Sequence, residues 1–200
     1  MRYPKRKDVI PEHQTEFSPI LFDVLFGLLL FQSIGWFFSL KDAAHFCFFA
    51  LSLLIIVHWW LKYKSEEEVY GLDVNNSSLD LLFGVVEVVL LEAALLSATQ
   101  ADYVTAAFCF VLPLLTETVW ALLWRVFGSW RRSSKVKVRF MERLLERTMF
   151  LDLVTAGLVG GLLASSVSLT AAQFVAVFAG IYGLYVIMSF AFEIVDLKVF

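Results

Sequence analysis

Glu87, Glu92 and Glu117 are the residues whose chemistry fits their surroundings least. Glu87 and Glu92 lie in LDLLFGVVEVVLLEAALL, residues 79–96, and Glu117 lies in an equally apolar tract, residues 103–124. A charged carboxylate at the centre of a bilayer costs about 3 kcal/mol on insertion scales. Each of these glutamates therefore needs a partner that balances or removes its charge.

Glu87 and Glu117 form the first candidate pair. Glu87 lies eight residues into its tract, roughly 12 Å deep at 1.5 Å per residue, and Glu117 lies seven residues before Trp124, at a similar depth. Two carboxyl groups that face each other in apolar surroundings share one proton. The sequence predicts a proton or cation site here, with a purely structural, hydrogen-bonded carboxyl pair as the alternative.

Glu92 and His58 are further candidates for a proton or cation site. Glu92 lies five residues after Glu87 and so on a different helix face, where it would meet His45, Gln32 or a water-filled vestibule. A structural carboxyl is the simpler role for Glu92. His58 stands beside two tryptophans, which are typical of a membrane interface. It is expected to act as an anchor or, because histidine titrates near physiological pH, as a pH sensor.

Three aspartates open three of the apolar tracts, and a glycine follows each one after four or five residues. The motifs are LFDVLFG with Asp23, SLDLLFG with Asp80 and FLDLVTAG with Asp152. An aspartate in the first turn of a helix faces the positive end of the helix dipole, which explains its position without a function. The recurrence also suggests a two-helix unit repeated three times. These aspartates are kept as candidates for the proton or cation site.

The segments that carry these residues are long enough to cross a membrane. The 200 residues are 60% hydrophobic and 18% charged, with a mean hydropathy of +0.76, whereas soluble domains are about half apolar. About 20 helical residues span the roughly 30 Å of bilayer hydrocarbon. We therefore predict an all-α polytopic membrane protein with six transmembrane helices, at residues 19–40, 43–61, 79–98, 103–124, 150–169 and 171–194.

The basic residues predict the orientation of the chain. Fifteen of the sixteen Lys and Arg residues fall on one side of the predicted spans, and only Lys41 falls on the other. The positive-inside rule then places both termini in the cytoplasm. Residues 1–17 form a polar cytoplasmic segment without a secretory signal pattern, and residues 18–200 form the membrane domain. The connections on the outer side are short, which predicts three antiparallel two-helix hairpins.

The inner loop, residues 125–149, carries a basic cluster that would attract anionic lipid head groups. The candidates for this contact are Arg131, Arg132, Lys135 and Lys137, and an ordinary topology signal is the alternative. Farther along, Gly157, Gly161 and Ser165 form a small-residue face, as do Ala172, Ala176 and Gly180. Such faces allow close approach of helices. We expect them to pack the last two helices together, with a subunit interface as the alternative.

The sequence has no enzyme signature: it lacks a phosphate-binding glycine loop, HExxH, GxSxG and CxxC. We therefore expect no catalytic activity, no cofactor, no metal site and no nucleic-acid partner. Paired acids within a membrane more often move protons or cations.

Two segments carry a resemblance to a known family. LFDVLFGL, residues 21–28, resembles the FSDAVFAI-type signature of a six-helix potassium-channel family, through Asp23, Phe26 and Leu28. That family includes the endolysosomal transmembrane-protein-175 channel and its prokaryotic relatives. FALSLLIIVHWWLKYKS, residues 49–65, resembles the second helix of the same family. The sequence departs from the pattern at positions 17 and 22, where Phe stands in place of the Arg and Ser of the family.

The resemblance implies a homo-oligomer whose first helices line a pore. The pore-lining candidates are then Leu28, Leu30, Gln32 and Ile34. The first hypothesis is therefore a channel-like protein that conducts a monovalent cation, located in the cytoplasmic or an internal membrane. The second is a monomeric proton-coupled carrier that uses Glu87 and Glu117. The third is a membrane scaffold that does not transport and whose basic loop recruits lipid or a partner.

Overall fold

A computed structural model describes residues 17–70, 78–127 and 135–198. The six α-helices are α1 (Phe17–Trp36), α2 (Ala43–Tyr70), α3 (Ser78–Thr99), α4 (Tyr103–Phe127), α5 (Lys135–Ser165) and α6 (Ala171–Lys198). Two 3-10 turns, η2 (Phe37–Ser39) and η4 (Ser166–Ser168), lie in the connections, and these described ranges contain no strand. All six helices are long and apolar enough to cross a membrane, which confirms the all-α prediction and its six spans of membrane length.

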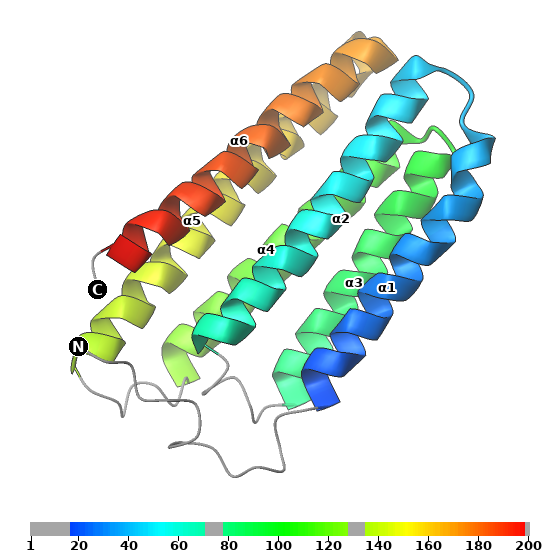
Figure 1. Ribbon diagram of the computed structural model, residues 1–200. Coiled ribbons are helices and arrows are strands. Elements are labelled where there is room, and N and C mark those ends of the chain that lie inside the picture. The colour runs from blue at the N-terminus through cyan, green and yellow to red at the C-terminus, as the bar shows by residue number, and fades with distance from the viewer. Residues whose placement is uncertain (1–16, 71–77, 128–134, 199–200) are drawn as a thin grey trace.

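The three short connections lie together at one end of the bundle (Figure 1), which we call the short-loop end. Each joins a helix that runs toward this end to one that runs away from it, and each provides an N-cap for the second helix. The Oδ1 of Asp42 accepts from the His45 amide at 2.8 Å, and the Oδ1 of Asp102 accepts from the Thr105 amide at 3.0 Å. At α6, Thr170 and Gln173 form a reciprocal capping box.

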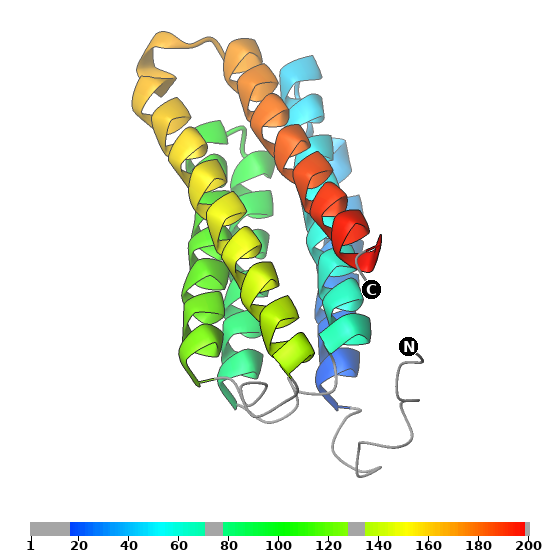
Figure 2. The same cartoon turned by 90° about the vertical axis from the view of Figure 1, so that its left-hand side faces the viewer.

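Helices α2 to α6 form a ring, and α1 lies outside it. Around the ring, α2 contacts α3, α3 contacts α4, α4 contacts α5, α5 contacts α6, and α6 returns to α2. The most extensive contacts are those of α4 with α3 and with α5. Helix α1 packs against α2 and α3 from outside the ring; it lies at the edge of the bundle in Figure 1 and behind α2 in Figure 2. One side of α1 therefore faces away from the bundle.

An aromatic column fills the ring between α2, α4 and α6. Phe178 packs at 5.3 Å from Phe48, at 5.9 Å from Phe110 and at 4.9 Å from Tyr182, measured between ring centroids. The Tyr182 hydroxyl donates to the Phe110 carbonyl at 2.8 Å. This bond lies beside Pro113, whose missing N–H disturbs the hydrogen bonding of the α4 backbone at that turn. The column leads along α6 to Tyr185.

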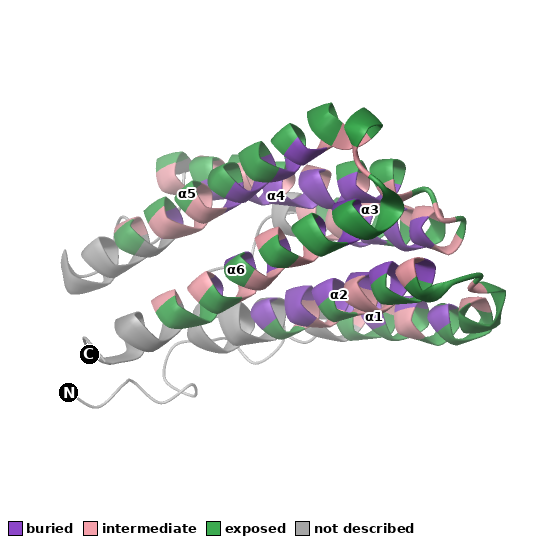
Figure 3. Ribbon diagram, turned by 90° about the horizontal axis from the view of Figure 1, so that it is seen from above, coloured by how far each residue is buried: buried purple, intermediate pink, exposed green. Residues whose placement is uncertain are grey.

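The small-residue faces do not pack α5 against α6, so that expectation is wrong. Gly157, Gly161 and Ser165 are exposed, as are Ala172, Ala176 and Gly180, and they lie on the outward faces of α5 and α6 coloured as exposed in Figure 3. A Cβ added at Gly157, Gly161 or Gly180 would meet no atom within 4 Å. Larger side chains on these helices are buried instead: Val159, Leu162, Phe174 and Phe178.

Candidate functional site

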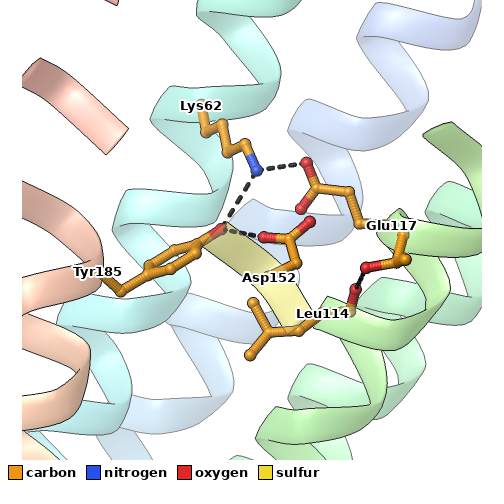
Figure 4. Close-up of polar contacts among 6 residues, drawn as sticks. Lys62, Leu114, Glu117, Asp152 and Tyr185 are labelled. Carbon is orange, nitrogen blue, oxygen red and sulfur yellow. Dashed lines mark hydrogen bonds and ion pairs between the residues drawn. The ribbon is translucent and has the colours of Figure 1, made fainter. Parts of the chain in front are cut away.

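A buried ion pair joins α2 to α4 at the centre of the ring. The Nζ of Lys62 donates to the Oε1 of Glu117, and only 8% and 7% of the two side chains are exposed. Ion pairs are seldom buried in this way, because the removal of each ion from water costs several kcal/mol and the attraction between the two ions must offset that cost. Figure 4 shows the two side chains reaching toward each other from their helices.

Tyr185 and Asp152 extend this pair into a chain across four helices. The Tyr185 hydroxyl, on α6, accepts from the Nζ of Lys62 at 3.2 Å and donates to the Oδ1 of Asp152, on α5, at 3.1 Å. Asp152 is fully buried, and Tyr185 is 1% exposed. Lys62 therefore lies between two carboxyl groups, one in direct contact and one reached through a hydroxyl (Figure 4). We call these four residues the polar cluster.

The two carboxyl groups of the polar cluster belong to residues well inside the apolar spans. Glu117 is six residues from Leu123, where the span of α4 ends, and Asp152 is seven residues from Leu145, where the span of α5 begins. At 1.5 Å per residue, these separations place the two carboxyl groups about 10 Å from the end of the spans. Such a depth is expensive for an ionisable group in a bilayer and is characteristic of functional positions.

Aromatic side chains and buried polar atoms surround the polar cluster. The Nζ of Lys62 lies 5.3 Å from the centroid of the Trp59 ring, within cation–π range. The ring of His58 packs edge-on against Tyr185, with centroids 5.6 Å apart. Within the described ranges, the buried atoms that lack a hydrogen-bond partner include Nδ1 of His58, Nε1 of Trp59 and Oε2 of Glu117. Buried polar atoms are rarely left this way, so the site has capacity for a proton or a small polar ligand.

Three predicted site residues meet here, and two members of the site were not predicted. Glu117, Asp152 and His58 stood out in the sequence because they interrupt apolar tracts. The sequence indicates Lys62 only as one of the charges that set the topology, and it does not indicate Tyr185. The one sequence signal for Lys62 is its place two residues after the tryptophans of α2. No local pattern distinguishes Tyr185 from the other aromatic residues of α6.

The predicted pair of Glu87 and Glu117 is not formed, since Glu117 pairs with Lys62 instead. Glu117 is buried on the side of α4 that faces the ring centre, whereas Glu87 is only half-buried on α3. An ammonium group also balances a carboxylate charge more fully than a second acid does. Equal depth in the two helices was therefore not enough to make these carboxyl groups partners.

Glu92 does not meet His45. The His45 ring is fully buried, and its Nδ1 accepts from the Lys41 amide at 3.2 Å, so Nε2 carries the proton and donates to the Ala98 carbonyl at 2.8 Å. Both ring nitrogens are therefore occupied, and the Nε2 bond fastens α2 to α3. Glu92 is exposed on α3, and Gln32 is exposed on α1.

The other aspartates lie away from the polar cluster or outside the described side chains. Asp23 is exposed on α1, and its Oδ1 accepts from the Trp60 Nε1 at 2.9 Å, which links α1 to α2. Asp80 belongs to α3, but its side chain is not among those described. Of the lipid candidates, Arg131 and Arg132 lie outside the described residues, and so do the side chains of two α5 residues, Lys135 and Lys137.

The pore-lining candidates do not share one environment. Leu28, Gln32 and Ile34 are exposed on α1, while Leu30 is partly buried and packs against the core. Leu30 therefore lacks the exposure of the other three, and candidates two residues apart lie on opposite sides of an α-helix. Among the described residues, no group of three or more His, Cys, Asp or Glu side chains is arranged to hold a metal ion.

No protein-family model, curated protein or solved structure matches the chain. The resemblance of the first two helices to the potassium-channel family therefore remains a prediction from those residues.

Proposed function

We propose that this protein is an integral membrane carrier that moves protons, alone or together with a solute, by protonation of the polar cluster. The observation that carries the proposal is the chain from Glu117 through Lys62 and Tyr185 to Asp152, drawn from four helices of one copy. Ionisable groups inside a membrane bundle are characteristic of proton relays in pumps and transporters. In this proposal the three hairpins stand with both termini in the cytoplasm.

Lys62 is the moving part of the proposed mechanism. A proton that binds Glu117 at its Oε2, which has no hydrogen-bond partner in the described part of the chain, neutralises the carboxylate and weakens its attraction for the ammonium group. Lys62 is then drawn toward Asp152, along the Tyr185 hydroxyl that already connects them. In this second state, the main polar contact of α2 is with α5 and α6 instead of α4. Loss of the proton reverses the change, which gives two states whose populations depend on protonation.

Proton flux into liposomes tests the proposal. Purified protein is reconstituted in vesicles that contain a pH-sensitive dye, and a membrane potential is imposed. The parent should acidify the lumen faster than empty vesicles do. Glu117→Gln should lower the rate at least tenfold, because an amide cannot take up the proton. Tyr185→Phe should also lower it, because the connecting hydroxyl is lost.

The matched control is Glu146→Gln. Glu146 pairs with Arg125 at 2.8 Å, but this pair is exposed, at 52% and 40% of the side chains. Glu146→Gln should keep the parental rate, because the carboxylate that it removes is exposed to solvent. Equal rates for the parent and for Glu117→Gln would show that the buried ion pair only holds the helices together.

A second candidate function is a cation channel lined by α1 of several copies. The observation in its favour is that Leu28, Gln32 and Ile34 face outward on a helix that lies outside the ring. In that case Leu28→Trp should alter cation flux, and Glu117→Gln should leave it unchanged. The carrier proposal gives the opposite result for both variants.

A further inference from the structure

Glu92 and Gln32 present polar side chains on an apolar outer surface. Both are exposed, and neither has a hydrogen-bond or ion-pair partner in the ranges that the structure describes. Around Glu92, the exposed residues of α3 are apolar: Leu82, Val86, Val89 and Leu96. Lipid tails can cover these apolar neighbours, but they cannot form a hydrogen bond with a carboxyl group at this depth. Something other than lipid tails must therefore cover Glu92.

The two polar residues lie at the same depth on neighbouring helices. Gln32 is seven residues before Ser39, where the span of α1 ends, and Glu92 is seven residues before Thr99, where the span of α3 ends. Helices α1 and α3 contact each other, and both run toward the short-loop end (Figure 1). Both groups therefore lie about 10 Å from that end of the spans, at 1.5 Å per residue.

We infer that this surface of α1 and α3 binds a second copy of the chain, with Gln32 of each copy hydrogen-bonded to Glu92 of the other. Two copies in the same orientation, related by a twofold axis along the membrane normal, keep every residue at its own depth. Equal depth is therefore the condition for a contact between two different residues, and this pair meets it. A carboxamide and a carboxyl group can each satisfy the other as donor and acceptor.

Close approach of the two copies is not hindered by α1. Gly35, three residues after Gln32 and so its neighbour on the helix surface, is exposed, and a Cβ added there would meet no atom within 4 Å. Small residues let membrane helices approach until polar side chains can bond between them. The contact is separate from the polar cluster, so a failure of the proposed proton flux would leave this inference standing.

Cysteine cross-linking between two variants tests the contact. Gln32→Cys and Glu92→Cys are made in full-length protein from which Cys47 and Cys109 have been removed, and they are reconstituted in lipid vesicles singly and mixed. A disulfide needs the two Cα atoms within about 7 Å. The cross-linked dimer should therefore form in the mixture and much less in either variant alone. A mixture of Gln32→Cys with Leu54→Cys, exposed on α2, is the control.

The dimer fraction at several protein-to-lipid ratios is the second measurement. Glu92→Gln should dimerise like the parent, because an amide still bonds to Gln32, and Glu92→Leu should weaken the dimer at least tenfold. Val89→Leu is the matched control on the same helix. The inference is overturned if Glu92→Leu dimerises like the parent, or if the cross-link is no stronger than in the Leu54 control. It is also overturned if Gln32→Cys cross-links mainly to itself and reacts with a water-soluble thiol reagent, which would indicate a pore lined by α1.

Discussion

Removing Glu117 alone should destabilise the protein far more than removing Glu117 and Lys62 together. The two residues are 5% and 9% exposed, and breaking a buried ion pair by deleting one partner costs about 3–5 kcal/mol. Glu117→Leu should fall near 3 kcal/mol, because Lys62 keeps the Tyr185 hydroxyl at 3.2 Å and the Trp59 ring. Lys62→Met should cost a similar amount, since it leaves a buried carboxylate that must take up a proton.

The double variant Lys62→Met/Glu117→Leu should lie within about 1 kcal/mol of the parent, since apolar residues often replace a buried ion pair without loss. The assay is reversible unfolding in mixed micelles, followed by tryptophan fluorescence. Glu146→Leu, from the exposed pair with Arg125, should cost less than about 1 kcal/mol. The reasoning fails if the two single losses add in the double variant, or if Glu117→Leu is as mild as Glu146→Leu.

Two further predictions concern packing and topology. An added Cβ at Gly84 would overlap the Phe22 ring, so Gly84→Ala should push α1 away from α3 and lower the stability by about 1–3 kcal/mol. A Cβ at Gly161 meets no atom, so Gly161→Ala is the control and should be nearly neutral. Equal melting temperatures for the two variants would contradict this prediction. Ala101→Cys, between α3 and α4, should react with an impermeant thiol reagent added outside cells, and Ser134→Cys should react only after the membrane is opened. Labelling of Ser134→Cys from outside would invert the proposed orientation.

The helices could be predicted because a bilayer leaves few alternatives. Backbone groups in hydrocarbon must be hydrogen-bonded within their own segment, so an apolar tract of about 20 residues implies a helix. The helix ends were less predictable. Helix α2 continues to Tyr70, beyond the predicted end at residue 61, and α5 begins at Lys135, well before residue 150. Hydropathy marks where the membrane is, whereas a helix can continue beyond the membrane into water.

The polar cluster could be predicted only in part. The sequence gives the depth of a residue in the membrane, but it does not give the helix that its side chain faces. Glu117 and Asp152 interrupt apolar tracts, and their depth follows from counting residues. Which carboxyl faces which partner depends on how the helices are rotated in the bundle, and hydropathy of nearly uniform tracts says little about rotation. The predicted partner Glu87 has a similar depth, but Glu117 pairs with Lys62 instead. The observed partner, Lys62, lies at the end of its span, where a lysine usually serves the interface.

Lys62 reaches the centre of the bundle because of the direction in which its helix runs. Side chains lean toward the N-terminus of their own helix, and α2 begins at the short-loop end. A lysine near the far end of its span therefore extends its stem inward, opposite to the usual movement of a lysine toward the interface. Helix α5 runs the other way, so Asp152 leans back toward Lys62. Arg147, one turn before Asp152 on the same helix, leans away and packs against the Phe192 ring at 5.5 Å. The direction of each helix thus decides which charges of this protein meet inside the bundle and which remain at its edge.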